Sequence, residues 1–141
     1  MRSTRRWPLL VPTCALLILT GCRDQTTEEE VGYEPATVEE IEGSDLPRVV
    51  MKEAAARRIE LETSPAVEAG GQVAVPESAI WVDVNGEEWV YTNPEPLVFV
   101  RAPVVVDRYE GGRAYLSKGL AAGTEVATVG VAELIGSEFG I

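Results

Sequence analysis

The stretch LSKGLAAGTEVATVG, Leu116–Gly130, is the part of the sequence that most resembles a phosphate-binding loop, because three glycines lie among small and apolar residues. A phosphate-binding loop places its glycines between a strand and a helix, and a lysine followed by Ser or Thr comes after the last glycine. Here Lys118 precedes Gly119, and β-forming residues follow Gly123. The pattern therefore predicts a turn between two strands, in which glycine adopts positive φ at little cost.

No other residues form a recognisable catalytic constellation. The sequence has no histidine, which removes the commonest general base. Ser78 lies in PESAI, without the G-x-S-x-G elbow of an activated serine. The carboxylate pairs Glu39/Glu40 and Glu87/Glu88 fall in a polar segment and at a hairpin tip, where solvation explains them. We therefore expect a protein that is not an enzyme.

The composition also argues against metal, cofactor and nucleic-acid binding. Calcium loops of EF-hand spacing are absent, and Met51 is the only methionine after Met1, so the clusters typical of soft-metal binders are missing. The formal net charge is -11, and an acidic chain is repelled by phosphates. We expect no cofactor, no metal and no nucleic-acid partner.

Cys22 is the residue to which we assign chemistry. It ends the sequence Leu19-Thr20-Gly21-Cys22, which follows a basic N-terminus and a short apolar run. That order is typical of an export signal, and the run is shorter than the roughly 20 residues of a membrane span. Leu, two small residues and Cys are similar to the lipobox of bacterial lipoproteins. The alternatives are a plain anchor, or an ordinary export signal with a chance cysteine.

The lipobox interpretation predicts a signal peptide over residues 1–21 and an anchor of diacylglycerol and palmitate-type acyl chains on Cys22. Cleavage removes three of the 12 basic residues and none of the 23 acidic ones, so the formal net charge falls from -11 to -14. Residues 22–45 are polar and acidic without apolar periodicity, which predicts a disordered tether. Anionic headgroups repel such a chain everywhere except at its lipid.

Residues 46–141 are predicted to form one all-β domain, a β-roll or barrel-like fold. Turn signals recur about every ten residues, as expected for short antiparallel strands. The alanine-rich segment MKEAAARRIE predicts one short helix near residues 52–59. Residues 125–129 are expected to form the last strand, and residues 131–141 a short helical or irregular tail. PLVFVRAPVVVD is expected to be a strand broken or bulged at Pro103.

Two hairpins are predicted from glycine-containing turns. Asn85-Gly86 lies between alternating strands and indicates a two-residue turn. That turn would place Val82 opposite Trp89 and bury Ile80, Val82 and Val84 on one face. RYEGGRAYL predicts a second hairpin with Gly111-Gly112 at its tip.

The order of motifs in the β domain resembles a known family. The motifs are VPESA from Val75, WVYT from Trp89, FVRAPV from Phe99 and GLAAGTEVATVG from Gly119. They resemble the C-terminal part of the periplasmic adaptor, or membrane fusion, proteins of resistance-nodulation-division efflux pumps. VVMKEAAARRIELETSPAVE is similar to the segment that precedes the barrel in that family. The resemblance implies a membrane-proximal adaptor domain.

The chain departs from the family in the segment between those two parts. A full adaptor has a β-barrel, a lipoyl-like domain and a long helical hairpin there, whereas this chain has only EAGGQ. The resemblance therefore implies docking to an inner-membrane transporter. It does not imply docking to an outer-membrane channel, because the domains that reach the channel are missing.

We expect a lipid-anchored envelope protein that faces the periplasm and acts as an accessory component of an efflux or export system. Association with a pump favours the inner membrane over the outer membrane. Two alternatives stay open: a stand-alone ligand-binding or sensing module of the envelope, and a degenerate adaptor remnant without an active role.

Replacing the lipidated cysteine tests the anchor. Cys22→Ala is expected to leave the β domain folded and to abolish membrane retention, because no acyl chain can be attached. Fractionation of cells with detection of the protein measures this. An unchanged distribution between membrane and soluble fractions would contradict the lipobox interpretation.

Overall fold

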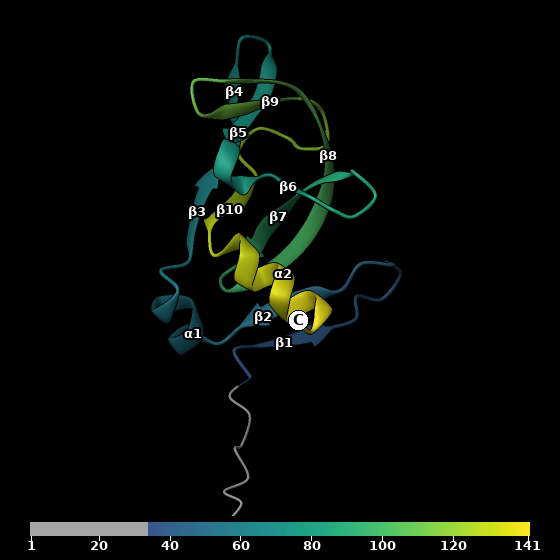
Figure 1. Ribbon diagram of the computed structural model, residues 1–141, viewed down its shortest axis with the longest axis vertical. Helices are drawn as coiled ribbons and strands as arrows, with labels where there is room; N and C mark the ends of the chain where they lie inside the picture. The colour runs from purple at the N-terminus through teal and green to yellow at the C-terminus, as the bar shows by residue number, and fades with distance from the viewer. Residues whose placement is uncertain (1–33) are drawn as a thin grey trace, which may run out of the picture. The chain divides into compact units, whose positions relative to one another are not determined.

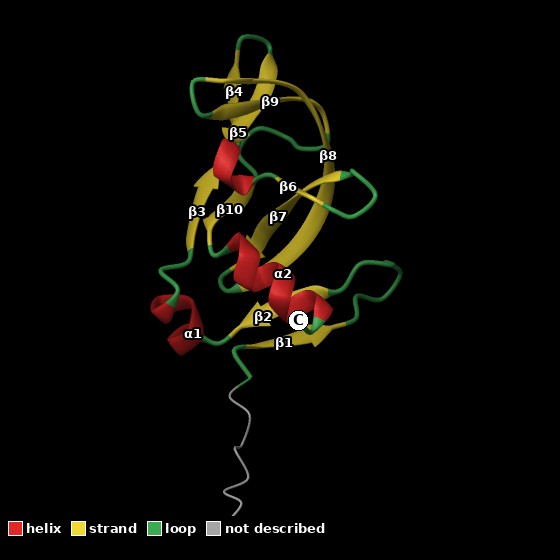
Figure 2. Ribbon diagram, in the orientation of Figure 1, coloured by secondary structure: helices red, strands yellow, loops and turns green. Residues whose placement is uncertain are grey.

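The computed structural model describes residues 34–141, which form a mostly β unit with a strongly curled antiparallel sheet (Figures 1 and 2). The predicted all-β class is therefore confirmed. The strands are β1 (Ala36–Glu39), β2 (Arg48–Met51), β3 (Glu62–Pro65), β4 (Val67–Ala69), β5 (Gln72–Pro76), β6 (Trp81–Val82), β7 (Glu88–Glu95), β8 (Val98–Glu110), β9 (Arg113–Lys118) and β10 (Glu125–Val129). The helices are α1 (Glu53–Arg58), the 3₁₀ turn η1 (Glu77–Ala79) and α2 (Val131–Phe139).

The sheet follows the order β3-β10-β7-β8-β9-β5-β4, with β1 and β2 attached through β8, and β6 attached through β7. β8 pairs with β7 along one edge and, along the other, first with β2 and then with β9. All of these pairings are antiparallel. A single long strand therefore connects the end of the sheet near α2 with the end that carries the β4–β5 hairpin (Figure 1).

The core consists of two clusters of buried apolar side chains. The first lies between α2, α1 and the β1–β2 end of the sheet and includes Val49, Phe99 and Leu134, each at most 2% exposed. The second fills the inside of the curl and includes Val90 and Val126, both fully buried. Because side chains alternate across a strand, neighbouring residues of β7 supply both clusters.

Both predicted helical segments are present. The alanine-rich segment forms α1, whose Ala55 and Ala56 are buried. The C-terminal tail forms α2, which begins after Gly130 in the left-handed region and buries Leu134 against the first cluster. Both helices cover the β1–β2 end of the sheet.

The N-terminal boundary of the folded unit differs from the prediction. The segment 22–45 was expected to be disordered, but its residues Ala36–Glu39 form β1 and pair with β2 from Ala36↔Met51 to Glu39↔Arg48. Arg48 also forms an ion pair with Glu39, with an N–O distance of 2.7 Å. Pairing with β2 supplies the order that the acidic sequence does not indicate by itself.

The hairpin around Asn85-Gly86 is present, but its register differs by one residue from the prediction. Trp81 lies opposite Trp89 and Val82 opposite Glu88, so five residues, 83–87, connect the paired positions. The Asp83 carboxylate accepts the backbone N–H groups of Asn85 and Glu87, at 2.8 and 2.9 Å, and this selects the longer loop. A one-residue shift exchanges the two faces of a strand. Val82 and Val84 are therefore exposed, whereas Trp81 packs against the core.

The expected break at Pro103 is also wrong, because β8 continues through it. β2 pairs with β8 only as far as Val100, and β9 begins to pair at Val105. Pro103 therefore pairs with β7 on one side and has no strand among residues 34–141 on its other side, and such an open edge is where a strand tolerates the missing N–H of proline. The register shifts lie further on, between Val105 and Arg108.

The remaining turn predictions are confirmed. Gly111 and Gly112 form the tip of the β8–β9 hairpin with φ of 59° and 74°. Lys118 ends β9 and Glu125 begins β10, so the stretch Leu116–Gly130 closes the sheet and a strand follows its first two glycines.

Gly119 and Gly123 form a matched pair for a stability test. A Cβ at Gly119 would lie 2.7 Å from the Pro103 carbonyl oxygen, whereas a Cβ at Gly123 meets nothing within 4 Å, and both residues have positive φ. Gly119→Ala should lower the free energy of unfolding by roughly 2–5 kcal/mol, because backbone atoms must move. Gly123→Ala should cost about 1–2 kcal/mol. Urea denaturation measures both, and equal losses would contradict the close approach.

Candidate functional site

The residues to which the sequence assigns lipidation and cleavage lie outside the described part of the chain. Leu19, Thr20, Gly21 and Cys22 all precede Glu34, where the description begins. The lipid anchor therefore stays a prediction.

In the folded unit, the residues considered for catalysis are either exposed or engaged in contacts that hold the fold together. Ser78 lies on the surface in η1. Glu88 Oε2 accepts the backbone N–H of Val106 at 2.8 Å, and its Oε1 accepts the Tyr109 hydroxyl at 3.2 Å. Glu88 therefore connects β7 to β8 at the point where β8 shifts register. Glu39 is occupied by its ion pair with Arg48.

Four aromatic rings from distant parts of the sequence meet beside α2. Trp81 stacks on Trp89 and Tyr91 with ring centroids 6.2 and 6.0 Å apart, and it meets Phe139 edge-on at 6.3 Å. The β6–β7 register that departs from the prediction is what brings Trp81 and Trp89 together. Such pairs contribute about 0.5–1.5 kcal/mol each beyond the area they bury.

A buried ion pair lies under these rings and holds the C-terminal helix to the sheet. Arg101 Nε lies 2.9 Å from Glu138 Oε1, and the two side chains are 19% and 3% exposed. The Arg101 guanidinium also lies over the rings of Trp89 and Phe139, at 4.7 and 5.3 Å from their centroids. A guanidinium suits this position because it stacks on aromatic faces while it pairs with a carboxylate.

Tyr91 completes this polar cluster. Its hydroxyl donates a hydrogen bond of 2.6 Å to Glu138 Oε2. Burial, together with the neighbouring Glu138 carboxylate, raises the pKa of Tyr91 far above its usual range. Tyr91 therefore keeps its proton at every physiological pH and acts as a permanent donor to Glu138. The cluster therefore holds α2 to the sheet.

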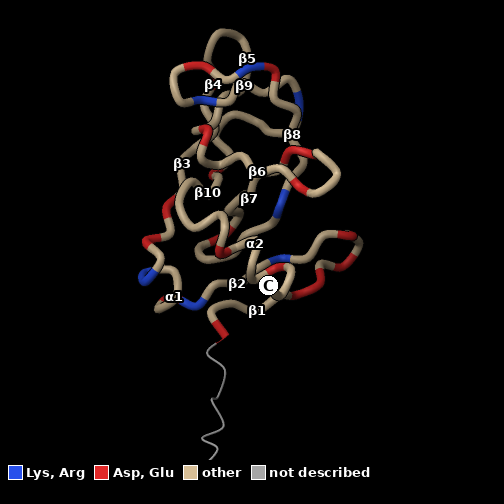
Figure 3. Tube along the Cα trace, in the orientation of Figure 1, with Lys and Arg blue, Asp and Glu red and all other residues tan. Residues whose placement is uncertain are grey.

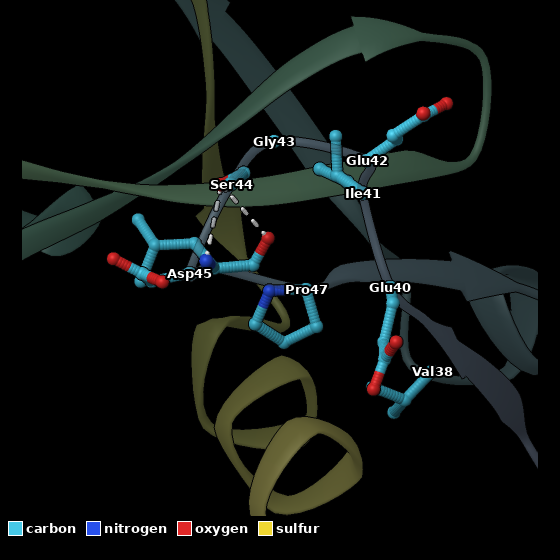
Figure 4. A pocket seen from close by; sticks show the side chains of 9 residues that line it. Val38, Glu40, Ile41, Glu42, Gly43, Ser44, Asp45 and Pro47 are labelled. Carbon is cyan, nitrogen blue, oxygen red and sulfur yellow. Dashed lines mark hydrogen bonds between the residues drawn. The ribbon is translucent and has the colours of Figure 1, made fainter.

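The loop of residues 40–47, between β1 and β2, surrounds an open pocket with an acidic rim (Figure 4). Glu40, Glu42 and Asp45 line it. The Ser44 hydroxyl donates to the Leu46 carbonyl and accepts the Leu46 N–H, which closes the loop on itself. Within residues 34–141, His, Cys, Asp and Glu side chains form no group of three that could hold a metal ion.

A second concavity runs between β1 and the two helices, and we name it the β1 groove. Most of the residues that line it are apolar, and its charged lining residues are Glu34, Arg58 and Glu133. The residues that line it are Glu34, Pro35, Ala36, Thr37, Val38, Met51, Ala55, Arg58, Ile59, Ala132, Glu133, Gly136, Ser137, Gly140 and Ile141. A concave apolar surface with a few polar groups is the usual form of a binding site. Sequence reasoning missed this groove because it depends on β1 being ordered.

Comparisons with known proteins add no family assignment. No protein-family model matches the chain, and no curated protein matches its sequence. Neither helix among residues 34–141 is long and apolar enough to cross a bilayer.

We expect the ion pair of the polar cluster to contribute much more to the free energy of unfolding than an exposed ion pair does. Glu138→Ala should lower the free energy of unfolding by roughly 3–5 kcal/mol, because Arg101 stays buried without its partner. Tyr91→Phe should cost about 1.5–3 kcal/mol, since it removes a hydrogen bond to a charged group. Glu53→Ala, which breaks the exposed pair with Arg57, should cost at most about 0.5 kcal/mol.

Chemical denaturation of the three variants measures these losses, and a cost for Glu138→Ala close to that of Glu53→Ala would contradict the cluster. The pH dependence provides a second check. The folded state raises the pKa of Tyr91, so the stability gained from its hydroxyl is complete below the usual tyrosine value of 10.0. The difference between the wild-type chain and Tyr91→Phe should therefore shrink as the pH rises above that value.

Proposed function

We propose that this chain is a lipid-anchored, non-catalytic envelope protein whose β domain binds an inner-membrane efflux or export transporter. The lipid on Cys22 would hold it to the membrane, with the β domain in the periplasm. The sequence motifs that resemble the membrane-proximal domain of periplasmic adaptors motivate this proposal.

The observation that carries the proposal is how the two motif-bearing segments combine. β2 and β3, from the first segment, pair with β8 and β10 from the second. The first segment then returns directly through the β4–β5 hairpin, whose turn is Gly70-Gly71 with φ of 61° and 79°. A two-residue hairpin turn lies where the resembled family carries its other domains. Loop tips are where domains are most readily inserted or removed.

The positions of the buried polar and the exposed apolar side chains also support a binding role over a catalytic one. Three polar side chains with little exposure, Arg101, Glu138 and Tyr91, hold α2 to the sheet. Exposed apolar residues are spread over separate regions of the surface, including Val84 at the β6–β7 tip and Val38 on β1. Val38 and Val84 therefore give two separate positions at which contact with a partner can be tested.

Site-specific cross-linking in the native host tests the proposal. A photo-reactive amino acid is placed at Val38, at Val84 or at Glu110, three exposed positions on different parts of the domain. We expect one position, but not all three, to cross-link to a transporter subunit, with the Cys22→Ala variant giving no product. Failure of all three positions, with unchanged drug sensitivity on deletion of the gene, would refute the proposed function.

A further inference from the structure

The outer edge of β1 carries free main-chain hydrogen-bonding groups. β1 pairs with β2, and no strand among residues 34–141 pairs with its other edge. The Lys52 N–H donates to the Pro35 carbonyl at 2.9 Å. This bond identifies Pro35 as a hydrogen-bonded position of the β1–β2 ladder. Hydrogen-bonded positions alternate in an antiparallel pair, so the N–H and C=O groups of Ala36 and Val38 point away from β2. Such an edge is a template for another strand.

The side chains of the same two residues face the β1 groove. Ala36 lies opposite Met51 and Val38 opposite Val49, on the face of the sheet that carries the first core cluster. Val38 is 43% exposed, and Ile141, across the groove, is 91% exposed. A strand added to β1 would therefore place every second side chain over an apolar surface already formed by the core.

Charge decides what can occupy this edge. Glu34, Glu133 and Arg58 are the charged residues that line the groove, so two acidic groups face one basic group there. Within the described residues, the carboxylates of Glu40, Glu42 and Asp45 in the adjoining loop form no ion pair. Figure 3 shows the red acidic positions gathered on that loop. The site therefore favours a positively charged occupant.

The same charge argues against the two occupants that this protein could supply itself. The N-terminal part of the chain has three consecutive glutamates, Glu28–Glu30, shortly before the start of β1. A second copy that paired through its own β1 would bring the same acidic loop, with Glu40, Glu42 and Asp45, to this edge. Both would place like charges side by side, which opposes strand pairing.

We propose that β1 binds an extended segment of a partner protein as an additional antiparallel strand, with apolar side chains in the β1 groove and basic side chains at the alternate positions. Main-chain hydrogen bonds to Ala36 and Val38 supply affinity, and the groove and the acidic loop supply specificity. This inference goes beyond the proposed function, because it holds for any partner of that chemistry, whether or not the partner is a transporter.

Binding of a synthetic peptide to the full chain in nonionic detergent tests the inference. The probe is a fluorescein-labelled, end-blocked octapeptide of alternating valine and lysine, measured by fluorescence anisotropy against micelles alone. Saturable binding is expected, and a peptide of alternating valine and glutamate should bind at least about tenfold more weakly. Failure of the valine–lysine peptide to bind would overturn the inference.

A matched pair of variants separates main-chain pairing from apolar contact. Val38→Pro removes the outward N–H and leaves the β1–β2 bonds in place, so affinity should fall at least about tenfold, which is the loss of roughly one hydrogen bond. Val38→Thr keeps that N–H and should change affinity less than about threefold. Circular dichroism checks that both variants fold. If Val38→Pro unfolds, a valine–lysine peptide N-methylated at alternate residues replaces it and should not bind.

Other occupants give distinct results that would overturn the proposal. Concentration-dependent self-association of the full chain, lost in Val38→Pro, would assign the edge to a second copy. Binding of the peptide that appears only after residues 23–33 are deleted would assign the edge to the chain itself. Because this test contains no transporter, failure of the peptide and failure of the cross-linking experiment are distinguishable.

Discussion

The fold depends on the two-sided pairing of β8. One edge of this strand pairs with β7 from Val98 to Val104, while the other edge serves β2 first and β9 afterwards. Phe99 of β8 belongs to the cluster under the helices, and Val104 belongs to the cluster inside the curl. Phe99 and Val104 lie on opposite faces of β8, so alternation along the strand supplies both clusters. The register shifts after Val104 accompany the curl of the sheet.

Local chemistry in the sequence was sufficient to predict the class and several turns. The Gly111-Gly112 hairpin, the last strand and the alanine-rich helix depend on residues close together in the chain, so their signals are readable. The register of the Asn85-Gly86 hairpin could not be predicted in this way, because the Asp83 side chain accepts the N–H groups of the turn and so changes its length. β1 was missed for another reason, since its order comes from pairing with β2.

The parts of the candidate site were largely beyond sequence reasoning. Arg101 and Glu138 are 37 residues apart, and Tyr91 is a further ten residues from Arg101, so nothing in their spacing indicates contact. The β1 groove needs an ordered β1, a helix after β2 and a C-terminal helix at the same end of the sheet. Long-range contacts of this kind are set by the fold as a whole, whereas Cys22 could be assigned from four consecutive residues.

The position of Glu34 has a mechanical consequence. The described chain enters the domain at the open end of the β1–β2 hairpin, where Ala36 pairs with Met51. A force applied at Glu34 and directed away from the sheet loads the hydrogen bond from the Lys52 N–H to the Pro35 carbonyl first, and the bonds further along β1 only after that one has broken. β1 would then detach by unzipping at low force, while the ladder between β7 and β8 stays intact. The strand that presents the free edge is therefore also the one that tension on the N-terminal side reaches first.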